Sequence, residues 1–175
     1  MKGRNHLICG TVTGCCLMAS TILSGEADYG VTGMAVAATM VGSLFPDIDS
    51  RTSKLGSKMK ITSTIANKLF GHRGFLHSPL FVLVALGILS IVFTKAEIKE
   101  YSLIYYGFII GMINHLFCDM LTKGGIPLFY PLSKWKFSIL PMKSGSKWEF
   151  IPLFITCIII CVITGLFILG GTFLV

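Results

Sequence analysis

The sequence predicts an all-α membrane protein, a polytopic bundle of four to five transmembrane helices with a metal site on its cytoplasmic side. Of its 175 residues, 53% are hydrophobic and only 13% are charged, whereas soluble chains average about 25% charged residues. This composition excludes a water-soluble domain. Helices satisfy every backbone polar group inside lipid, so we expect one membrane-embedded helical domain over residues 1–175.

Five apolar runs approach the length of about 20 residues that crosses a hydrocarbon core of about 30 Å. The second and third runs are short, so those two helices could be tilted or half-inserted instead of spanning fully. The first run could be mistaken for a signal peptide, but it lacks a clean cleavage site and we expect it to be retained. The runs are Leu7 to Leu23, Tyr29 to Phe45, Pro79 to Thr94, Tyr101 to Leu121 and Ile151 to Val175.

Two long loops, residues 46–78 and 122–150, separate the second run from the third and the fourth from the fifth. The segment from Thr52 to Phe70 spaces its apolar residues as an interfacial helix does, and a solvated basic loop is an equal alternative. The segment from Gly124 to Pro152 combines prolines with tryptophans and other aromatic residues. Prolines break helices and aromatic residues favour the headgroup zone, so we expect an irregular loop on the inner leaflet.

Basic residues predict the orientation of the chain. Of the 15 lysines and arginines, only Lys95 and Lys99 belong to the opposite face from the two long loops and the N-terminus. The positive-inside rule therefore predicts a multi-pass membrane protein with a cytoplasmic N-terminus. The formal net charge of +7 suits attraction to anionic membrane lipids, and we expect no nucleic-acid partner because the basic residues follow helix ends.

The six cysteines are expected to be small buried hydrophobic residues. They lie inside apolar runs, and their spacing matches no paired metal motif. They are Cys9, Cys15, Cys16, Cys118, Cys157 and Cys161.

Seven metal-competent side chains gather at the predicted cytoplasmic level. Ionisable residues at membrane depth are costly, and a cluster of imidazoles and carboxylates is the donor set that divalent metals prefer. The set holds all four histidines and three aspartates: His6, His72, His77, His115, Asp47, Asp49 and Asp119.

Helix geometry predicts that these ligands meet. His115 and Asp119 are four residues apart and share one helix face. Small residues lead toward the ligands at the same spacing in three helices, and such ladders allow helices in membranes to approach closely. The ladders are Gly107 and Gly111 before His115, Gly10 and Gly14 after His6, and Ala35, Thr39 and Ser43 before Asp47.

The ends of two helices place further ligands. Ser78 is expected to be the N-cap of the third helix and Pro79 its first residue, which sets His77 at the helix start. Pro46 is expected to end the second helix before Asp47, and Asp47 and Asp49 should alternate across an extended turn.

Three ordered motifs resemble a known family. The motifs are Phe45-Pro46-Asp47-Ile48-Asp49, His72-Arg73-Gly74-x-x-His77-Ser78, and Asn114-His115-x-x-x-Asp119-x-x-Thr122-x-x-Gly125-Ile126-Pro127-Leu128 with Tyr130-Pro131 following. They are similar to those of the YdjM-like, LexA-binding family of inner-membrane metal-dependent hydrolases. The resemblance runs from His6 to about Pro141 and implies a small membrane-embedded hydrolase of phospholipase-like character.

The order of ligands is also similar to the first half of the zinc-dependent phospholipase C pattern. That pattern continues with a further histidine and a His-x-x-x-Glu motif, which this chain lacks after Asp119. We therefore expect one or two divalent ions, zinc first and manganese or magnesium as alternatives, in place of a three-zinc centre.

The first functional hypothesis is hydrolysis of a phosphoester or ester at the cytoplasmic leaflet by metal-activated water. The expected metal ligands are His6, Asp47, His72, His77, His115 and Asp119. Asp49 is expected to orient a histidine or bridge a second metal and to act as a base, and Arg73 is expected to clamp the phosphate. Glu149 is an alternative base.

Other classes of function stay open from the sequence. A divalent-metal transporter or metal sensor would also use histidine and aspartate in helices, although transport sites sit near the bilayer midplane. A non-catalytic platform for a cytosolic partner needs no ligand cluster. Covalent catalysis through Ser78 or Cys118 is a lesser alternative. The oligomeric state does not follow from the sequence.

Overall fold

The computed structural model describes residues 1–23, 25, 28–50, 53, 57, 61, 64, 74–98, 101–140 and 142–172. These residues are all-α, as predicted. Within this part of the chain, three short 3-10 helices accompany the α-helices: η1 (Phe45–Asp49), η2 (Phe75–His77) and η4 (Lys147–Glu149). The α-helices of the described residues are α1 (Gly3–Leu23), α2 (Tyr29–Gly42), α4 (Pro79–Lys95), α5 (Ser102–Met120) and α6 (Phe150–Thr172).

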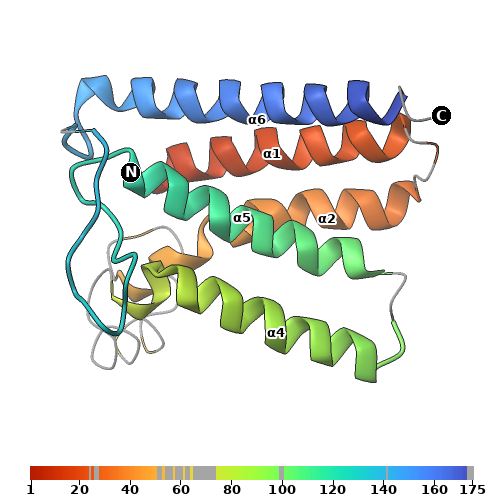
Figure 1. Ribbon diagram of the computed structural model, residues 1–175, viewed down its shortest axis with the longest axis horizontal. Coiled ribbons are helices and arrows are strands. Elements are labelled where there is room, and N and C mark those ends of the chain that lie inside the picture. Colours follow the sequence, from red (N-terminus) through yellow and green to blue (C-terminus); the bar gives the residue numbers. More distant parts are fainter. Residues whose placement is uncertain are drawn as a thin grey trace.

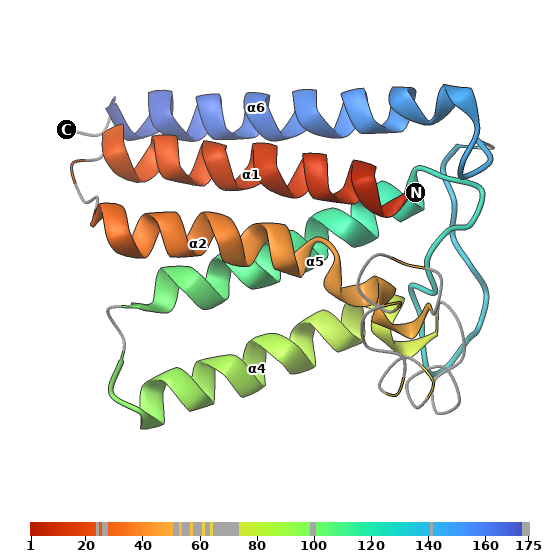
Figure 2. The ribbon, with the colours of Figure 1, turned by 180° about the vertical axis from the view of Figure 1, so that it is seen from behind.

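The helices lie side by side with their axes roughly along one direction (Figures 1 and 2). Helix α5 packs against α2, α1 and α4, while α6 lies mainly against α1. The N-terminus, η1, η2, the last turn of α5 and the first turn of α6 lie at the same end of the bundle (Figure 1). Every described segment that carries a predicted ligand is therefore at one end.

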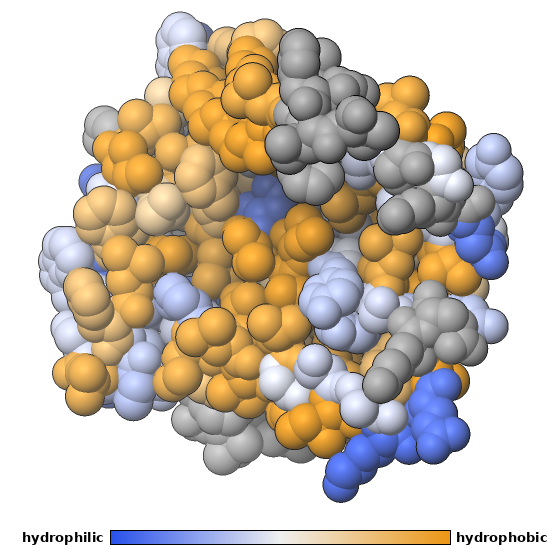
Figure 3. All heavy atoms as spheres, turned by 45° about the vertical axis from the view of Figure 1, so that its right-hand side comes forward, coloured by the Kyte–Doolittle hydropathy of each residue, from blue (hydrophilic) through white to orange (hydrophobic). Residues whose placement is uncertain are grey.

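Among the described residues, three helical segments are long and apolar enough to cross a membrane: Gly3–Leu23, Ser102–Met120 and Lys147–Leu166. Helices α2 and α4 are apolar but shorter, as the lengths of the second and third runs indicate. Hydrophobic side chains cover most of the described surface in Figure 3. Outward-facing apolar residues of α4 and α6 such as Leu83 and Phe154, 64% and 65% exposed, are what lipid-facing helices require.

The contact between α2 and α5 depends on glycine. A Cβ atom on Gly111 would lie 2.2 Å from the Thr39 carbonyl oxygen, and one on Gly107 would lie 2.6 Å from the Ala35 carbonyl oxygen. Any larger residue would force the two backbones apart. The predicted ladders on these two helices thus face each other and set their separation.

Glycines in the first half of α1 allow a similar close approach. A Cβ atom on Gly10 would lie 2.4 Å from the Ser43 hydroxyl oxygen, and one on Gly14 would lie 3.0 Å from a Val36 side-chain carbon. Asn114 of α5 also donates a hydrogen bond to the Thr13 hydroxyl at 3.1 Å. Helix α1 is therefore held against both α2 and α5 just beyond His6.

Local capping signals begin two helices as expected from their chemistry. Ser78 is the N-cap of α4, its hydroxyl accepts a hydrogen bond from the Phe81 amide, and Pro79 is the first helical residue. Asp28 caps α2 by accepting hydrogen bonds from the amides of Gly30 and Val31. Such caps satisfy amides that have no partner within the helix.

The expectation of an extended turn at Asp47 and Asp49 was wrong. Helix α2 ends at Gly42, and both aspartates lie in the 3-10 helix η1. Pro46 fixes a backbone angle that is compatible with this tight helix, and its missing amide is not needed in a first turn. The segment from Thr52 to Phe70 lies almost entirely outside the described residues.

Between α5 and α6 the chain is irregular, as predicted, but it is tied back to the bundle. An isolated antiparallel bridge pairs Ile126 with Phe137. The Ile139 amide donates a hydrogen bond to the Met120 carbonyl at 2.8 Å, and the Lys123 amide donates one to the Met142 carbonyl at 2.8 Å. These bonds give the loop a defined backbone without regular secondary structure.

Candidate metal centre

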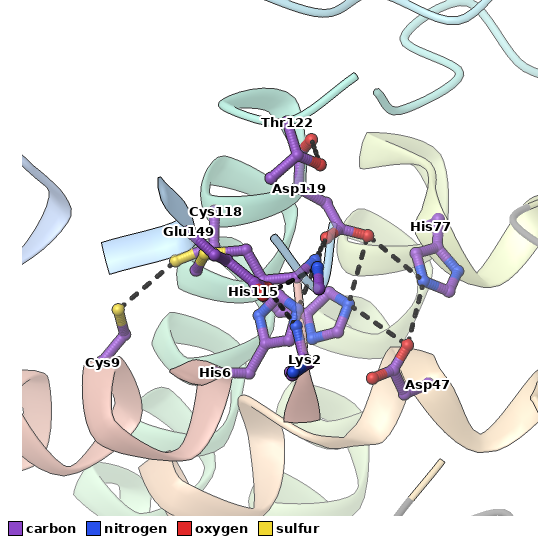
Figure 4. Close-up of polar contacts among 12 residues, drawn as sticks. Lys2, His6, Cys9, Asp47, His77, His115, Cys118, Asp119, Thr122 and Glu149 are labelled. Atoms are coloured by element: carbon purple, nitrogen blue, oxygen red, sulfur yellow. Dashed lines mark hydrogen bonds and ion pairs between the residues drawn. The ribbon is translucent and has the colours of Figure 1, made fainter. Parts of the chain in front are cut away.

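The candidate site lies where α1, α5, η1 and η2 meet. Figure 4 shows the side chains of His6, His115, Asp119, His77 and Asp47 pointing toward one another from these four elements. Four of the five side chains are wholly buried, and only Asp47 is partly exposed, at 14%. A buried cluster of two carboxylates and three imidazoles is expensive unless a cation or protons balance it.

One group of ligand atoms comes from α1 and α5. His6, His115 and Asp119 each offer an atom within 4.8 Å of the other two. The Nε2 atom of His6 is 3.4 Å from Asp119 Oδ1, and the two imidazole rings stack with centroids 3.8 Å apart. The close approach of α1 to α5 places the two rings against each other.

A second group adds the two 3-10 helices and shares His115. Asp47, His77 and His115 also offer atoms that all lie within 4.8 Å of one another. His77 Nε2 is 3.7 Å from Asp47 Oδ1, and His115 Nε2 is 3.9 Å from the same oxygen. Asp119 Oδ2 lies 3.9 Å from the Nε2 atoms of both histidines, so it connects the two groups.

The outer nitrogens of two histidines have partners that orient the rings. His115 Nδ1 is 2.7 Å from the Ser43 carbonyl oxygen, which accepts a hydrogen bond when Nδ1 carries the proton. His77 Nδ1 is 3.4 Å from Asp49 Oδ2. A partner of this kind selects the tautomer whose Nε2 lone pair points into the site, as in metal-binding histidines generally.

The spacing suits one or two small divalent ions. Ligand atoms bound tetrahedrally at about 2.0–2.2 Å from an ion lie about 3.3–3.6 Å apart, and the distances between the facing atoms here run from 3.4 to 3.9 Å. His6 Nδ1 has no hydrogen-bond partner in the described part of the chain, and Nε2 of His6 and of His115 lie beside carboxylate oxygens at 3.4 and 3.9 Å without forming a hydrogen bond of normal geometry. Buried polar atoms are otherwise nearly always paired, so the residues fit a metal.

Charge couples the two ligands that lie outside the helical spans. Burial acts to raise the pKa of Asp47, but the hydrogen bond to His77 and the charges of His115 and His6 outweigh it and hold that pKa below its usual value. Burial acts to lower the pKa of His77, but hydrogen bonds to Asp47 and Asp49 raise it above its usual value. The arrangement thus favours an ionised Asp47 carboxylate beside a positively charged His77.

Neighbouring groups close the site toward the bundle end. The amino nitrogen of Met1 contacts Asp119 Oδ1. The Thr122 hydroxyl donates to the Asp119 carbonyl at 2.9 Å, which closes the last turn of α5. Glu149 accepts hydrogen bonds from the backbone amides of Lys2 and Gly145. One carboxylate oxygen of Glu149 holds the backbone just before α1 and the other holds the loop at Gly145, so this geometry favours a structural role over that of a base.

Cysteine thiols adjoin the site on its apolar side. Cys9 and Cys118 are wholly buried, and their sulfur atoms are 3.4 Å apart. The Cys118 sulfur is also 3.7 Å from the Thr156 hydroxyl oxygen. Cys157 packs against the same cluster, whereas Cys15 and Cys161 are exposed on the helix surfaces. Burial of the first two agrees with the expectation of buried hydrophobic residues, and the exposure of Cys15 and Cys161 shows that it was wrong for those two.

The structure brings together five of the six residues expected to bind metal, and His72 lies outside the described residues, as does Arg73. Asp49 is buried beside His77 and lies on the side of that ring away from Asp47. Sequence reasoning did not anticipate the Ser43 carbonyl as the partner of His115. The sequence signal that could have indicated this contact is the spacing of small residues, which predicted that Ser43 lies at a helix contact.

A family model described as the YdjM inner membrane protein matches residues 1–174 of this chain. The chain belongs to the YdjM inner membrane protein family. The resemblance of the three motifs to this family is thereby confirmed, and the family description agrees with the apolar helices.

Individual relatives of the YdjM family support the same assignment. An uncharacterised protein of Bacillus subtilis strain 168, YvsG, is 35% identical over 150 residues, which cover 85% of each chain. The inner membrane protein YdjM of Escherichia coli K12 is 35% identical over 124 residues, which are 66% of this chain and 60% of that relative. No solved structure matches the chain.

Proposed function

We propose that this member of the YdjM family is a metal-dependent hydrolase that cleaves a phosphoester or ester at the cytoplasmic leaflet. The observation that carries the proposal is the pair of ligand groups that share His115 at one end of a membrane bundle. Zinc suits the mixed imidazole and carboxylate donors, and manganese or magnesium are alternatives. A divalent ion bound there would supply polarisation of a phosphoryl or carbonyl oxygen and activation of water.

The residues of the chain would have distinct roles in this reaction. His6, His115 and Asp119 would hold one ion, and Asp47, His77 and the shared His115 would hold or complete a second. Asp49 would orient His77 through its Nδ1 atom, or take a proton from water. Arg73 would bind the substrate phosphate, and His72 would be a further ligand.

The proposed membrane arrangement follows from charge and helix length. All five α-helices of the described residues would cross the bilayer, with α2 and α4 extended by their flanking residues. The N-terminus and the loop between α5 and α6 would lie in the cytoplasm, because that end carries the basic residues. The site would then open at the level of the lipid headgroups, which makes a membrane phospholipid or a soluble phosphoester the substrate.

A metal transporter is the competing function, and the described residues favour it less. Transport needs ligands along a path through the bilayer. All the described histidines lie at one end, and Asp28 at the other end accepts hydrogen bonds from the α2 amides as its cap. The described residues therefore show one metal-competent cluster and no relay beyond it.

The deciding variant is Asp119→Asn, which keeps the size of the side chain and removes its charge. We expect normal membrane insertion, metal affinity reduced by at least about 10–100-fold, and loss of most hydrolysis, with partial rescue at high metal concentration. Elemental analysis of purified protein and turnover of phospholipids and generic phosphoesters measure these effects.

Asp28→Asn is the matched control, because asparagine also caps a helix and the residue lies at the far end of α2. That variant should keep its metal and its turnover. Metal flux across vesicles by the wild type, without cleavage of any tested ester, would instead establish a transporter.

A further inference from the structure

The loop of residues 121–149, between α5 and α6, presents an unusual surface. All five of its lysines are exposed, at positions 123, 134, 136, 143 and 147. Its only acidic residue, Glu149, is 4% exposed and is bound to backbone amides. The outward charge of the described loop is therefore entirely positive.

Large apolar side chains are exposed among these lysines. Leu132 is 94% exposed, and Trp135 and Phe129 are each 60% exposed. Trp148 is 55% exposed, and the Lys147 ammonium lies 5.6 Å from its ring centroid. Apolar groups rarely remain this exposed to water over one segment, so the pattern indicates a surface that meets something else.

The backbone holds these side chains outward. The two bridged residues, Ile126 and Phe137, flank the segment that carries Leu132 and Trp135. The Ser138 hydroxyl donates to the Thr122 carbonyl at 2.6 Å, next to the end of α5. The exposed residues therefore belong to a loop with a defined backbone, which is hydrogen-bonded to the end of the helix that carries Asp119.

The position of the loop indicates that it contacts the surface of the bilayer. It lies at the bundle end that holds the candidate metal centre, where α5 ends and α6 begins (Figure 1). Both helices are candidate spans, so a loop that joins them lies at a bilayer surface. Aromatic residues favour the interface between headgroups and acyl chains, and lysines beside it attract anionic lipids.

We propose that loop 121–149 is a binding surface for anionic phospholipid headgroups in the leaflet that faces the site. Its aromatic side chains and Leu132 lie among the upper acyl chains, and its lysines contact the lipid phosphates. The inference depends on the membrane location of the loop and not on hydrolysis, so it stands or fails separately from the proposed activity.

The chain contains two tryptophans, and both belong to this loop. Their fluorescence therefore reports on the loop of the unmodified protein. The full chain would be reconstituted in phosphatidylcholine vesicles containing equal minor fractions of brominated phosphatidylcholine or brominated phosphatidylglycerol, with bromine near the top of the acyl chain. We expect brominated phosphatidylglycerol to quench about twofold more strongly, and the excess to shrink at high salt.

Lys134→Gln combined with Lys136→Gln should remove the excess quenching by phosphatidylglycerol while leaving quenching by phosphatidylcholine. Lys95→Gln is the matched control, since Lys95 is an exposed lysine at the end of α4 away from the loop. The variants Trp135→Phe and Trp148→Phe show how much of the quenching comes from each tryptophan.

Two results would overturn the proposal. Equal quenching by both lipids in the wild type would show that the lysines do not select anionic headgroups. Absence of quenching by either lipid would show that the loop projects into water, where its charge would suit an acidic protein partner instead.

Discussion

His115 belongs to both ligand groups, so its orientation affects every other ligand. Its Nδ1 atom faces the Ser43 carbonyl, and its Nε2 atom lies 3.9 Å from both Asp47 Oδ1 and Asp119 Oδ2. The ring also stacks on His6. The partner of Nδ1 is a backbone carbonyl, which every residue type at position 43 would provide. The tautomer of His115 therefore depends on the backbone at the end of α2 and not on the serine side chain.

At the same scale, Asp49 should act through His77. Asp49→Asn removes the carboxylate charge beside His77 Nδ1 but keeps the size of the side chain. We expect metal affinity to fall about 10–100-fold, as is common when a carboxylate behind a ligating histidine is lost. Calorimetric titration with zinc measures the affinity, and thermal unfolding of the metal-free protein measures how much stability the contact between Asp49 and His77 contributes. Unaltered zinc affinity would remove Asp49 from the site.

At the scale of elements, the separation of α2 and α5 determines where the α5 ligands stand. Gly107 and Gly111 place the α5 backbone against the carbonyl oxygens of Ala35 and Thr39. The same α2 backbone continues to Ser43 and then into η1, which carries Asp47. The packing of two helices therefore aligns ligands from two segments, α5 and η1.

Gly111→Leu should impair activity although it removes no ligand. Its Cβ atom would meet the Thr39 carbonyl at 2.2 Å, and a shift of about 1 Å in catalytic groups can reduce the rate on the order of 100-fold. Overpacking of this kind also costs about 1–3 kcal/mol of stability. Turnover and thermal unfolding measure the two effects.

Gly87→Leu is the control for that substitution. A Cβ atom on Gly87 of α4 would meet nothing within 4 Å, so leucine there adds bulk without moving a helix. This variant should keep its turnover and its metal. Equal loss in both glycine variants would mean that the effect comes from leucine in a membrane helix and not from the contact between α2 and α5.

At the scale of the whole molecule, charge distinguishes the two ends of the bundle. The loop after α5 carries five exposed lysines, whereas the end of α4 carries Lys95 and is followed by Glu97. Cytoplasmic loops of membrane proteins hold an excess of basic residues. The site and the loop of residues 121–149 should therefore face the cytoplasm.

Cysteine substitution tests this orientation. In intact cells, a membrane-impermeant maleimide should label Lys95→Cys, and should label Lys134→Cys only after the membrane is permeabilised. Both lysines are exposed, and the native cysteines lie inside apolar helices, so the unsubstituted protein serves as background. The reverse pattern of labelling would place the metal centre outside the cytoplasm.

The sequence by itself determined the helices and the family of the chain. Apolar runs, the Ser78 cap and Pro79 are local signals, and the helices that they predict occur with ends shifted by a few residues. The three motifs sufficed to indicate the YdjM family. Hydrophobic length and capping act within one segment, which is why they are readable without a fold.

Tertiary structure alone decided which ligands meet and which atoms face one another. The stacking of His6 on His115, the bond from His115 to the Ser43 carbonyl and the 3-10 form of the segment with Asp47 and Asp49 join segments that are distant in the chain or depend on neighbouring packing. Spacing along one helix places His115 and Asp119 on one face, but it cannot give the distance to another helix. That distance is set by contact between backbones at glycine, so it exists only once the bundle has assembled.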